Sequence, residues 1–119
     1  WTRRQVAGSW SAWVETTSGA QSLAASGYKT LPGGLIIQWV VGTAAASGTS
    51  QTITFPIAFP ASVYRVFATA ETASVAGNST GVQIRAQSFT TTSVSVDLVN
   101  TLATPNANTV VPVVFAVGI

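Results

Sequence analysis

Cysteine, histidine and methionine are absent from the 119-residue sequence, and these absences exclude many kinds of chemistry. The chain itself can supply no thiol nucleophile, no disulfide, no Cys/His zinc site and no imidazole base. Helix-favouring Leu, Glu, Lys and Gln are scarce, whereas Ala, Thr, Val, Ser and Gly dominate. Because Val and Thr favour strands while Gly and Ser favour turns, the composition indicates a fold made of strands.

Charged residues are also rare, since five Lys or Arg and three Asp or Glu make up 7% of the chain. About 25% is ordinary for a soluble domain. A folded monomer of 12.2 kDa would expose about 6,000 Å² of surface, so eight charges leave most of it neutral. We therefore expect the surface to be covered by further copies of the chain and coated with neutral polar side chains. The net charge of +2 gives no indication of nucleic-acid binding.

Long hydrophobic runs are missing as well. The longest apolar stretches are Leu35–Gly42 and Val110–Ile119, and Gln38 and Pro112 interrupt them. Both are shorter than the roughly 18 residues that a membrane-spanning helix needs, so we expect no membrane insertion.

The N-terminal part of the chain has its own pattern. Residues 1–15 predict a β-hairpin, with strands on either side of Gly8-Ser9. Residues 16–30 are rich in Ser, Gly and Ala and predict a linker, with a short helix at Gln21–Ala25 as an alternative. The abrupt start at Trp1 within a strand-like pattern indicates a fragment of a longer protein.

Residues 31–119 predict a single tip domain built from strands. Leu31-Pro32-Gly33-Gly34 is a turn signature, and Pro56 and Pro60 indicate an irregular corner. The strands are expected at residues 35–41, 51–55, 63–71, 82–87, 94–99 and 110–119. Strands at this spacing with no helical pattern between them indicate an all-β fold, either an antiparallel β-sandwich (jelly-roll-like) or a small barrel.

Few residues are suited to catalysis or to metal binding. A glycosidase needs two carboxyl groups about 5–9 Å apart, and Glu71 with Asp97 is the one acidic pair outside the hairpin. Both residues also suit the solvated ends of strands. Lys29, the one lysine, lies in the expected linker and makes a poor partner for a nucleophilic serine. We expect neither a metal nor a cofactor, since no spacing typical of a calcium loop is present.

Two polar loops, at residues 72–81 and 100–109, are the candidate recognition surfaces. Asn, Ser and Thr on a rigid β scaffold give adaptable hydrogen bonding, although ordinary solvated loops have the same composition. Exposed Tyr side chains can stack on sugar rings, and an outward-facing Arg can pair with a phosphate or acidic sugar. The candidate receptor-binding residues are Asn78, Ser79, Thr80, Asn106, Asn108, Tyr28, Tyr64 and Arg85.

Two motifs carry a family resemblance. Leu31–Trp39 (LPGGLIIQW), followed by Phe55–Pro60 (FPIAFP), resembles the C-terminal gp53-like domain at the tips of many bacteriophage tail fibres. Residues 1–15 separately resemble the last strands of knob-like repeats in tail fibres and R-type pyocin fibres. Val40 stands where that family commonly has Gly, so we expect the strand to continue there.

The resemblance implies a homotrimeric, non-enzymatic tip of a phage or phage-tail-like particle. Such a tip would bind a bacterial surface receptor, either lipopolysaccharide or another surface glycan, or an outer-membrane protein. It would belong to the virion and act outside the cell after assembly in the bacterial cytoplasm. One alternative is a purely structural module that trimerises or caps the fibre. Another is a polysaccharide-cleaving tip, which would need Glu71 or Asp97.

Overall fold

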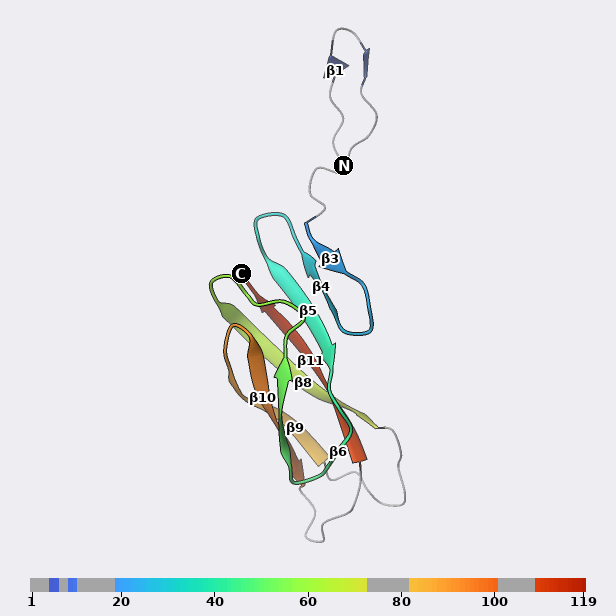
Figure 1. Cartoon of the computed structure of the whole chain (residues 1–119), viewed down its shortest axis with the longest axis vertical. Coiled ribbons are helices and arrows are strands. Elements are labelled where there is room, and N and C mark those ends of the chain that lie inside the picture. The colour runs from blue at the N-terminus through green and yellow to red at the C-terminus, as the bar shows by residue number, and fades with distance from the viewer. Residues whose placement is uncertain (1–4, 7–8, 11–18, 73–81, 101–108) are drawn as a thin grey trace.

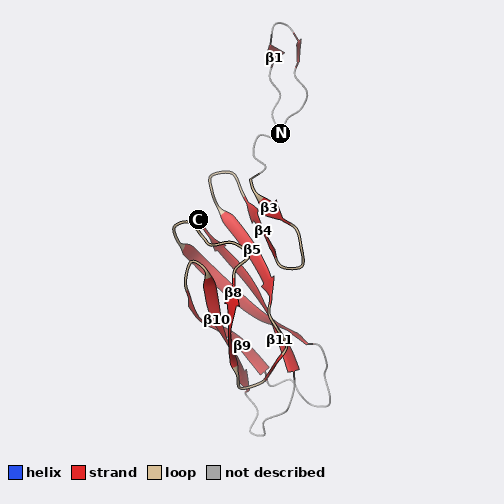
Figure 2. Ribbon diagram, viewed as in Figure 1, coloured by secondary structure: helices blue, strands red, loops and turns tan. Residues whose placement is uncertain are grey.

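The computed structural model describes residues 5–6, 9–10, 19–72, 82–100 and 109–119, and in these ranges every regular element is a strand (Figures 1 and 2). The strands are β1 (Gln5–Val6), β2 (Ser9–Trp10), β3 (Gln21–Ser22), β4 (Gly27–Thr30), β5 (Ile36–Val41), β6 (Ala45–Ala46), β7 (Ser50–Thr54), β8 (Val63–Thr72), β9 (Val82–Phe89), β10 (Ser93–Asn100) and β11 (Thr109–Gly118). No helix in the described ranges is able to span a membrane.

Two antiparallel sheets form a sandwich, as Figure 1 shows. The large sheet has the order β3-β4-β5-β11-β8, and β6 continues along the same edge of β11 that β5 occupies. The small sheet has the order β7-β10-β9. The predicted all-β antiparallel sandwich is confirmed. Its strand order, which the sequence did not predict, gives the two sheets unequal sizes.

The core lies between the sheets because alternate residues of each strand point inward. On β11, buried and more accessible positions alternate from Val110 to Gly118. Val94, Val96 and Leu98 on β10 are fully or almost fully buried against them. The main hydrophobic cluster consists of Ile36, Val40, Ile53, Phe55, Phe59, Val94, Val96, Val114 and Ala116.

The segment between β7 and β8 forms the irregular corner predicted from its two prolines. Phe55 and Phe59 pack edge to face, with ring centroids 5.3 Å apart. Gln38, the buried polar residue of β5, fixes this corner through both atoms of its amide. Its Nε2 donates to the Ile57 carbonyl at 2.9 Å, and its Oε1 accepts from the Ile57 N–H at 3.0 Å. An amide fully enclosed in the core is thereby satisfied.

The turn predicted at residues 31–34 is confirmed. The Gly34 N–H donates to the Leu31 carbonyl at 3.1 Å, and Gly33 has a φ of 86°. A positive φ at the third position of such a turn favours glycine. The strand that follows runs through Val40 to Val41 without a break, as expected.

Several local expectations differ from the structure. Residues 21–22 and 27–30, expected in a linker, form β3 and β4, which pair with each other, and β4 in turn pairs with β5. The alternative helix at residues 21–25 is wrong, because Gln21 and Ser22 are in β3. β6 lies inside the expected loop 43–50, where small alanines allow pairing with β11. In the hairpin, Ser9 is paired with Val6 and lies in a strand.

Candidate functional site

The outer face of the large sheet is apolar along β5 and β11, and a row of three aromatic residues crosses its centre. Phe115 on β11 lies directly opposite Trp39 on β5 and opposite Phe67 on β8. Residues opposite one another in a sheet share a face, so the three aromatic residues occupy neighbouring positions on that face. We call Trp39, Phe115 and Phe67 the aromatic row.

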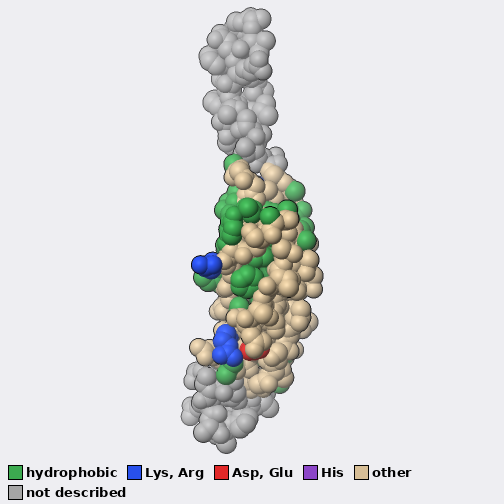
Figure 3. Space-filling view, turned by 90° about the vertical axis from the view of Figure 1, so that its left-hand side faces the viewer, with side chains coloured by type: hydrophobic (Ala, Val, Ile, Leu, Met, Phe, Trp, Pro, Cys, Tyr) green, Lys and Arg blue, Asp and Glu red, His purple; other side chains and the backbone are tan. Residues whose placement is uncertain are grey.

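Aliphatic pairs extend this surface on both sides of the aromatic row. Val117 lies opposite Ile37, and Val113 lies opposite Val41. Phe67 is 62% exposed, Phe115 42% and Val41 40%, which is unusual for such large apolar side chains. The apolar face is defined by Ile37, Trp39, Val41, Phe67, Val111, Val113, Phe115 and Val117. Figure 3 views the sandwich from the left-hand side of Figure 1, and hydrophobic side chains gather in the upper and middle part of that view.

The β3–β4 hairpin holds Trp39 in place. The indole Nε1 of Trp39 donates to the Ala24 carbonyl at 2.9 Å. Gly27 lies directly opposite Trp39, and a Cβ at Gly27 would come within 3.0 Å of the indole ring. The ring therefore crosses over a glycine, which fixes one end of the aromatic row.

The outer face of the small sheet is polar by contrast. Ser95 on β10 lies between Thr52 on β7 and Ser88 on β9, and Ser93 lies opposite Thr54. Hydroxyl groups of this kind are satisfied by water as readily as by a ligand. The two outer faces of the sandwich thus have opposite character.

One ion pair stands on this polar face. Asp97 on β10 is flanked by Ser50 on β7 and Arg85 on β9. The Ser50 hydroxyl donates to Asp97 Oδ1 at 2.7 Å, and Arg85 Nη2 donates to Oδ2 at 3.2 Å. The hydrogen bond from Ser50, followed by that from Arg85, holds the pKa of Asp97 below its usual value. The carboxylate therefore stays charged in mildly acidic solution.

The two polar loops join the same end of the sandwich. The end of β8 and the start of β9 border the first loop, the end of β10 and the start of β11 border the second, and all four lie at the lower end in Figure 1. The chain enters the sandwich at the other end, where Ala20 accepts a hydrogen bond from Thr30. The candidate residues Asn78, Ser79, Thr80, Asn106 and Asn108 lie outside the described residues.

The three candidates that are described lie apart from one another. Arg85 faces outward, with 61% of its side chain exposed, and is already paired with Asp97. Tyr28 lies opposite Gln38 on the inner face of the large sheet and is half-buried. Tyr64 is 44% exposed at an irregularity of β8, near the end where the chain enters. From β4 to β8 the sheet spans three strand spacings, about 14 Å, so the two Tyr residues do not form one stacking site.

The acidic pair considered for catalysis is separated by the sandwich. Glu71 lies opposite Val111 on the outer face of the large sheet, whereas Asp97 is on the outer face of the small sheet. Because packed sheets stand about 10 Å apart, two outward carboxyl groups on opposite faces cannot flank one glycosidic bond. Within the described ranges, no three His, Cys, Asp or Glu residues come together to hold a metal.

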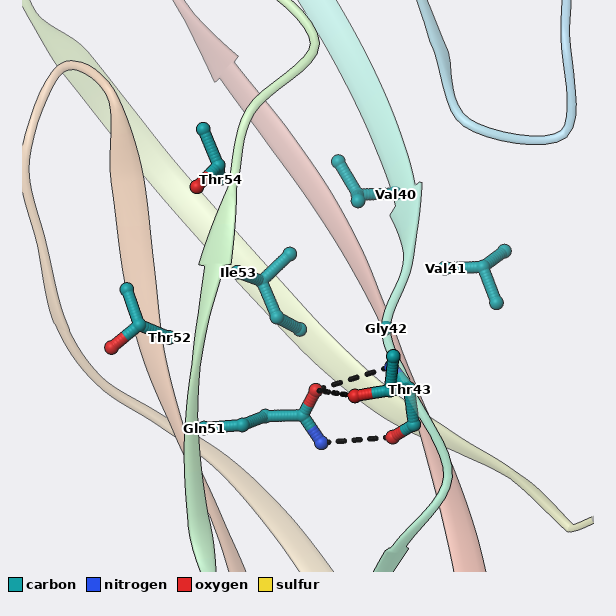
Figure 4. A pocket seen from close by; sticks show the side chains of 8 residues that line it. All are labelled: Val40, Val41, Gly42, Thr43, Gln51, Thr52, Ile53 and Thr54. Carbon is teal, nitrogen blue, oxygen red and sulfur yellow. Dashed lines mark hydrogen bonds between the residues drawn. The ribbon is translucent and has the colours of Figure 1, made fainter.

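A small groove of 230 Å³ lies between the end of β5 and the β7 strand (Figure 4). Gln51 crosses it, and its Nε2 donates to the Thr43 carbonyl at 3.0 Å. Its Oε1 accepts from the Thr43 N–H at 3.2 Å and from the Thr43 hydroxyl at 3.3 Å. The amide is thus engaged in joining two strands, which indicates a structural role.

Sequence reasoning missed both the aromatic row and the Ser50–Asp97–Arg85 cluster as sites. Each is assembled by strand register from residues far apart in the chain, such as Ser50 and Asp97, 47 positions apart. One signal was available for the aromatic row. β5 and β11 are apolar at nearly every position, which is typical of strands covered on both faces.

Comparison with known proteins identifies relatives of most of the chain. Residues 29–119 match the family of gp53-like tail fiber proteins, C-terminal region. The N-truncated R1-type pyocin tail fiber is 27% identical, with a TM-score of 0.71, over 84% of this chain and 84% of that one. No curated protein shows significant sequence similarity.

Longer pyocin fibres match the same part of the chain. The N-truncated R2-type pyocin tail fiber is 26% identical with a TM-score of 0.67. The match covers 84% of this chain and 37% of that fibre. The C-terminal R2 pyocin fiber of P. aeruginosa has the same identity and TM-score, and 25% of its length is covered. The chain therefore spans well under half the length of these two fibres.

Proposed function

Since the chain belongs to the family of gp53-like tail fiber C-terminal domains, we propose that it is the distal tip that binds a bacterial surface receptor. The receptor is lipopolysaccharide or another surface glycan, with an outer-membrane protein as the other candidate. The tip is part of the virion or pyocin-like particle, and it acts outside the cell after assembly in the bacterial cytoplasm. It works by binding, without catalysis.

The observation that carries this proposal is that the chain enters the sandwich at one end, while the polar loops are attached at the opposite end. The chain enters from residue 19 at one end, and Ile119 lies at that end too, hydrogen-bonded to Ser62. If the fibre shaft precedes residue 19, the opposite end points away from the particle. That end carries the attachment points of both polar loops.

The apolar face supports assembly as a homotrimer. Phe67 and Phe115 expose about half of their surface. Covering this exposed half would contribute about 1–2 kcal/mol for each ring. Arg65, the cation of β8, lies at the margin of this face, two residues from Phe67. Three copies that pack these faces together would remove this apolar surface from water.

Trimerisation also makes weak receptor contacts effective. Three tips on one fibre act together, and effective concentration can raise avidity by about 10²–10⁴ without any new contact. A tip that recognises a repetitive surface glycan therefore does not need high affinity in each copy.

Adsorption to cells tests the function. The fluorescently labelled chain should adsorb to a bacterial strain that the parent particle attaches to, and an excess of chain should block attachment of that particle. A chain that forms trimers but neither adsorbs nor competes would contradict receptor binding. That result would instead support the structural trimerisation or capping role.

Two phenylalanine variants separate assembly from general damage. Phe115→Ser removes the centre of the aromatic row and should abolish self-association. Phe89→Ser is the matched control, because Phe89 is 46% exposed but lies on β9, outside the apolar face. Retained trimers in Phe115→Ser, measured by light scattering, would show that the interface lies elsewhere.

A further inference from the structure

The Ser50–Asp97–Arg85 cluster borders a hollow at the end of the sandwich that carries the polar loops. The hollow has a volume of 370 Å³ and is lined by Gly48, Thr49, Ser50, Asp97, Leu98 and Val99. It is an open, shallow depression whose volume falls within the range of about 300–1,000 Å³ typical of small-molecule sites. Asp97 is the carboxylate in its wall.

The hollow has a fixed framework. The Leu98 N–H donates to the Thr49 carbonyl at 2.9 Å, and the Gly48 N–H donates to the Leu98 carbonyl. The Thr49 hydroxyl donates to the Ala46 carbonyl at 2.7 Å. Gly48 has a φ of +85°, and a Cβ at this position would meet nothing within 4 Å. The wall is thus held by backbone bonds while the space beside it stays open.

Asp97 has unused acceptor capacity, and 13% of its side chain is exposed. A carboxylate offers about four lone-pair positions, and within the described ranges Ser50 and Arg85 take one each. Arg85 has several further N–H donors and is 61% exposed. The cluster therefore places free acceptors and free donors side by side, which is the pattern that adjacent sugar hydroxyls complement.

Charge balance determines the class of sugar. Arg85 and Asp97 neutralise each other at 3.2 Å, so the site carries little net charge. An acidic sugar or a phosphate would have to approach the Asp97 carboxylate, which costs repulsion. An arginine by itself suggests pairing with phosphate. Asp97 weakens that pairing at Arg85, because it already neutralises the guanidinium. A neutral hexose with two adjacent free hydroxyls avoids this repulsion.

We propose that the hollow beside Asp97 is a subsite for a neutral hexose of the surface glycan, an inference that rests on the proposed receptor-binding function. Asp97 accepts hydrogen bonds from two adjacent hydroxyls of the sugar. Arg85 donates to an oxygen on the same sugar, and Val99 offers an apolar contact for its C–H groups. The subsite adds a binding element on the rigid sandwich, at the end where β10 finishes and β11 begins.

Nuclear magnetic resonance with simple sugars tests the subsite. The ¹⁵N-labelled chain is titrated with methyl glycosides of glucose, galactose, mannose and rhamnose at millimolar concentrations, and with methyl glucuronide as the acidic comparison. At least one neutral glycoside should shift the amide signals of Gly48, Thr49 and Leu98. No such shift with any neutral glycoside, or tighter binding of the glucuronide, would overturn the proposal.

Variants test whether glycoside binding depends on the Ser50–Asp97–Arg85 cluster. Asp97→Asn and Arg85→Gln should each weaken binding of the responding glycoside at least tenfold. Glu71→Gln, which makes the same change of acid to amide on the opposite face, should leave binding unchanged. Circular dichroism checks that each variant is folded. Unchanged binding in both cluster variants would show that the ion pair only stabilises the sheet.

The outcomes of the two tests are separable. Adsorption of the chain to cells without any glycoside response at the hollow would support the receptor-binding function and refute the subsite. A glycoside response at the hollow without adsorption to cells would refute the receptor-binding function, and with it the assignment of the sugar to a surface glycan, while sugar binding at the hollow would stand.

Discussion

Gln38→Glu is a nearly isosteric change whose effect should depend strongly on pH. The Gln38 side chain is fully buried, and its amide both donates to and accepts from the backbone of Ile57. A protonated carboxyl can reproduce both bonds, because its O–H donates and its carbonyl oxygen accepts. An ionised carboxylate cannot, since it would turn an acceptor toward the Ile57 carbonyl.

The size of the effect follows from burial. The cross-strand neighbours of Gln38 are Tyr28 and Ala116, and neither provides a positive charge for the introduced carboxylate. Burial alone raises a glutamate pKa by up to 3–5 units, and we take about 2–3 units here because Ile57 is only half-buried. At 1.36 kcal/mol per unit, and with the group partly ionised at pH 7, the variant should lose about 2.5–3.5 kcal/mol at that pH.

The sign of the pH dependence is specific. Because the folded-state pKa is raised, the loss is small below the unfolded pKa of about 4.3 and grows as pH rises toward the folded value. Urea unfolding of variant and wild type at about pH 4 and pH 7 measures the difference. The control Gln51→Glu, at a half-buried amide, should lose under about 1 kcal/mol at both values. An equal loss for Gln38→Glu at both pH values would refute the reasoning.

Two further predictions concern Gly27 and Asp97. Gly27→Ala should cost at least about 2 kcal/mol, since its Cβ would lie 2.1 Å from the Ser22 carbonyl oxygen. Gly33→Ala, where the Cβ meets open space but φ is +86°, should cost only about 1 kcal/mol; equal losses in thermal unfolding would contradict this. The lowered pKa of Asp97 stabilises the fold above the unfolded value of about 3.9, and this contribution is lost as pH falls through the folded value. Urea midpoints should therefore decline less steeply toward acid in Asp97→Asn than in wild type, and parallel declines would show that the cluster does not contribute.

Most long strands of the sandwich were predictable because their signals are local. Alternation in residues such as Val94 to Val99, together with turn residues such as Gly33, depends on nearest neighbours in sequence. β3 and β4 lack that signal. They are short and poorly alternating, and they are stabilised by tertiary contacts such as the bond between Trp39 and Ala24.

The candidate sites were less predictable because they depend on register and on which strands are neighbours. The aromatic row requires that β11 lie between β5 and β8, and a shift of one residue would turn Phe115 into the core. The separation of Glu71 from Asp97 on opposite faces has the same origin. Residue type alone gave the chemistry of Arg85 but not its pairing with Asp97.

The mass of the chain in solution tests the central claim most directly, namely that copies of the chain cover the apolar face. Light scattering coupled to size exclusion should give about 37 kDa, three times the 12.2 kDa chain. It should give a smaller mass for Phe115→Ser under the same conditions. A stable 12.2 kDa particle at high concentration, with the aromatic row open to water, would contradict the account.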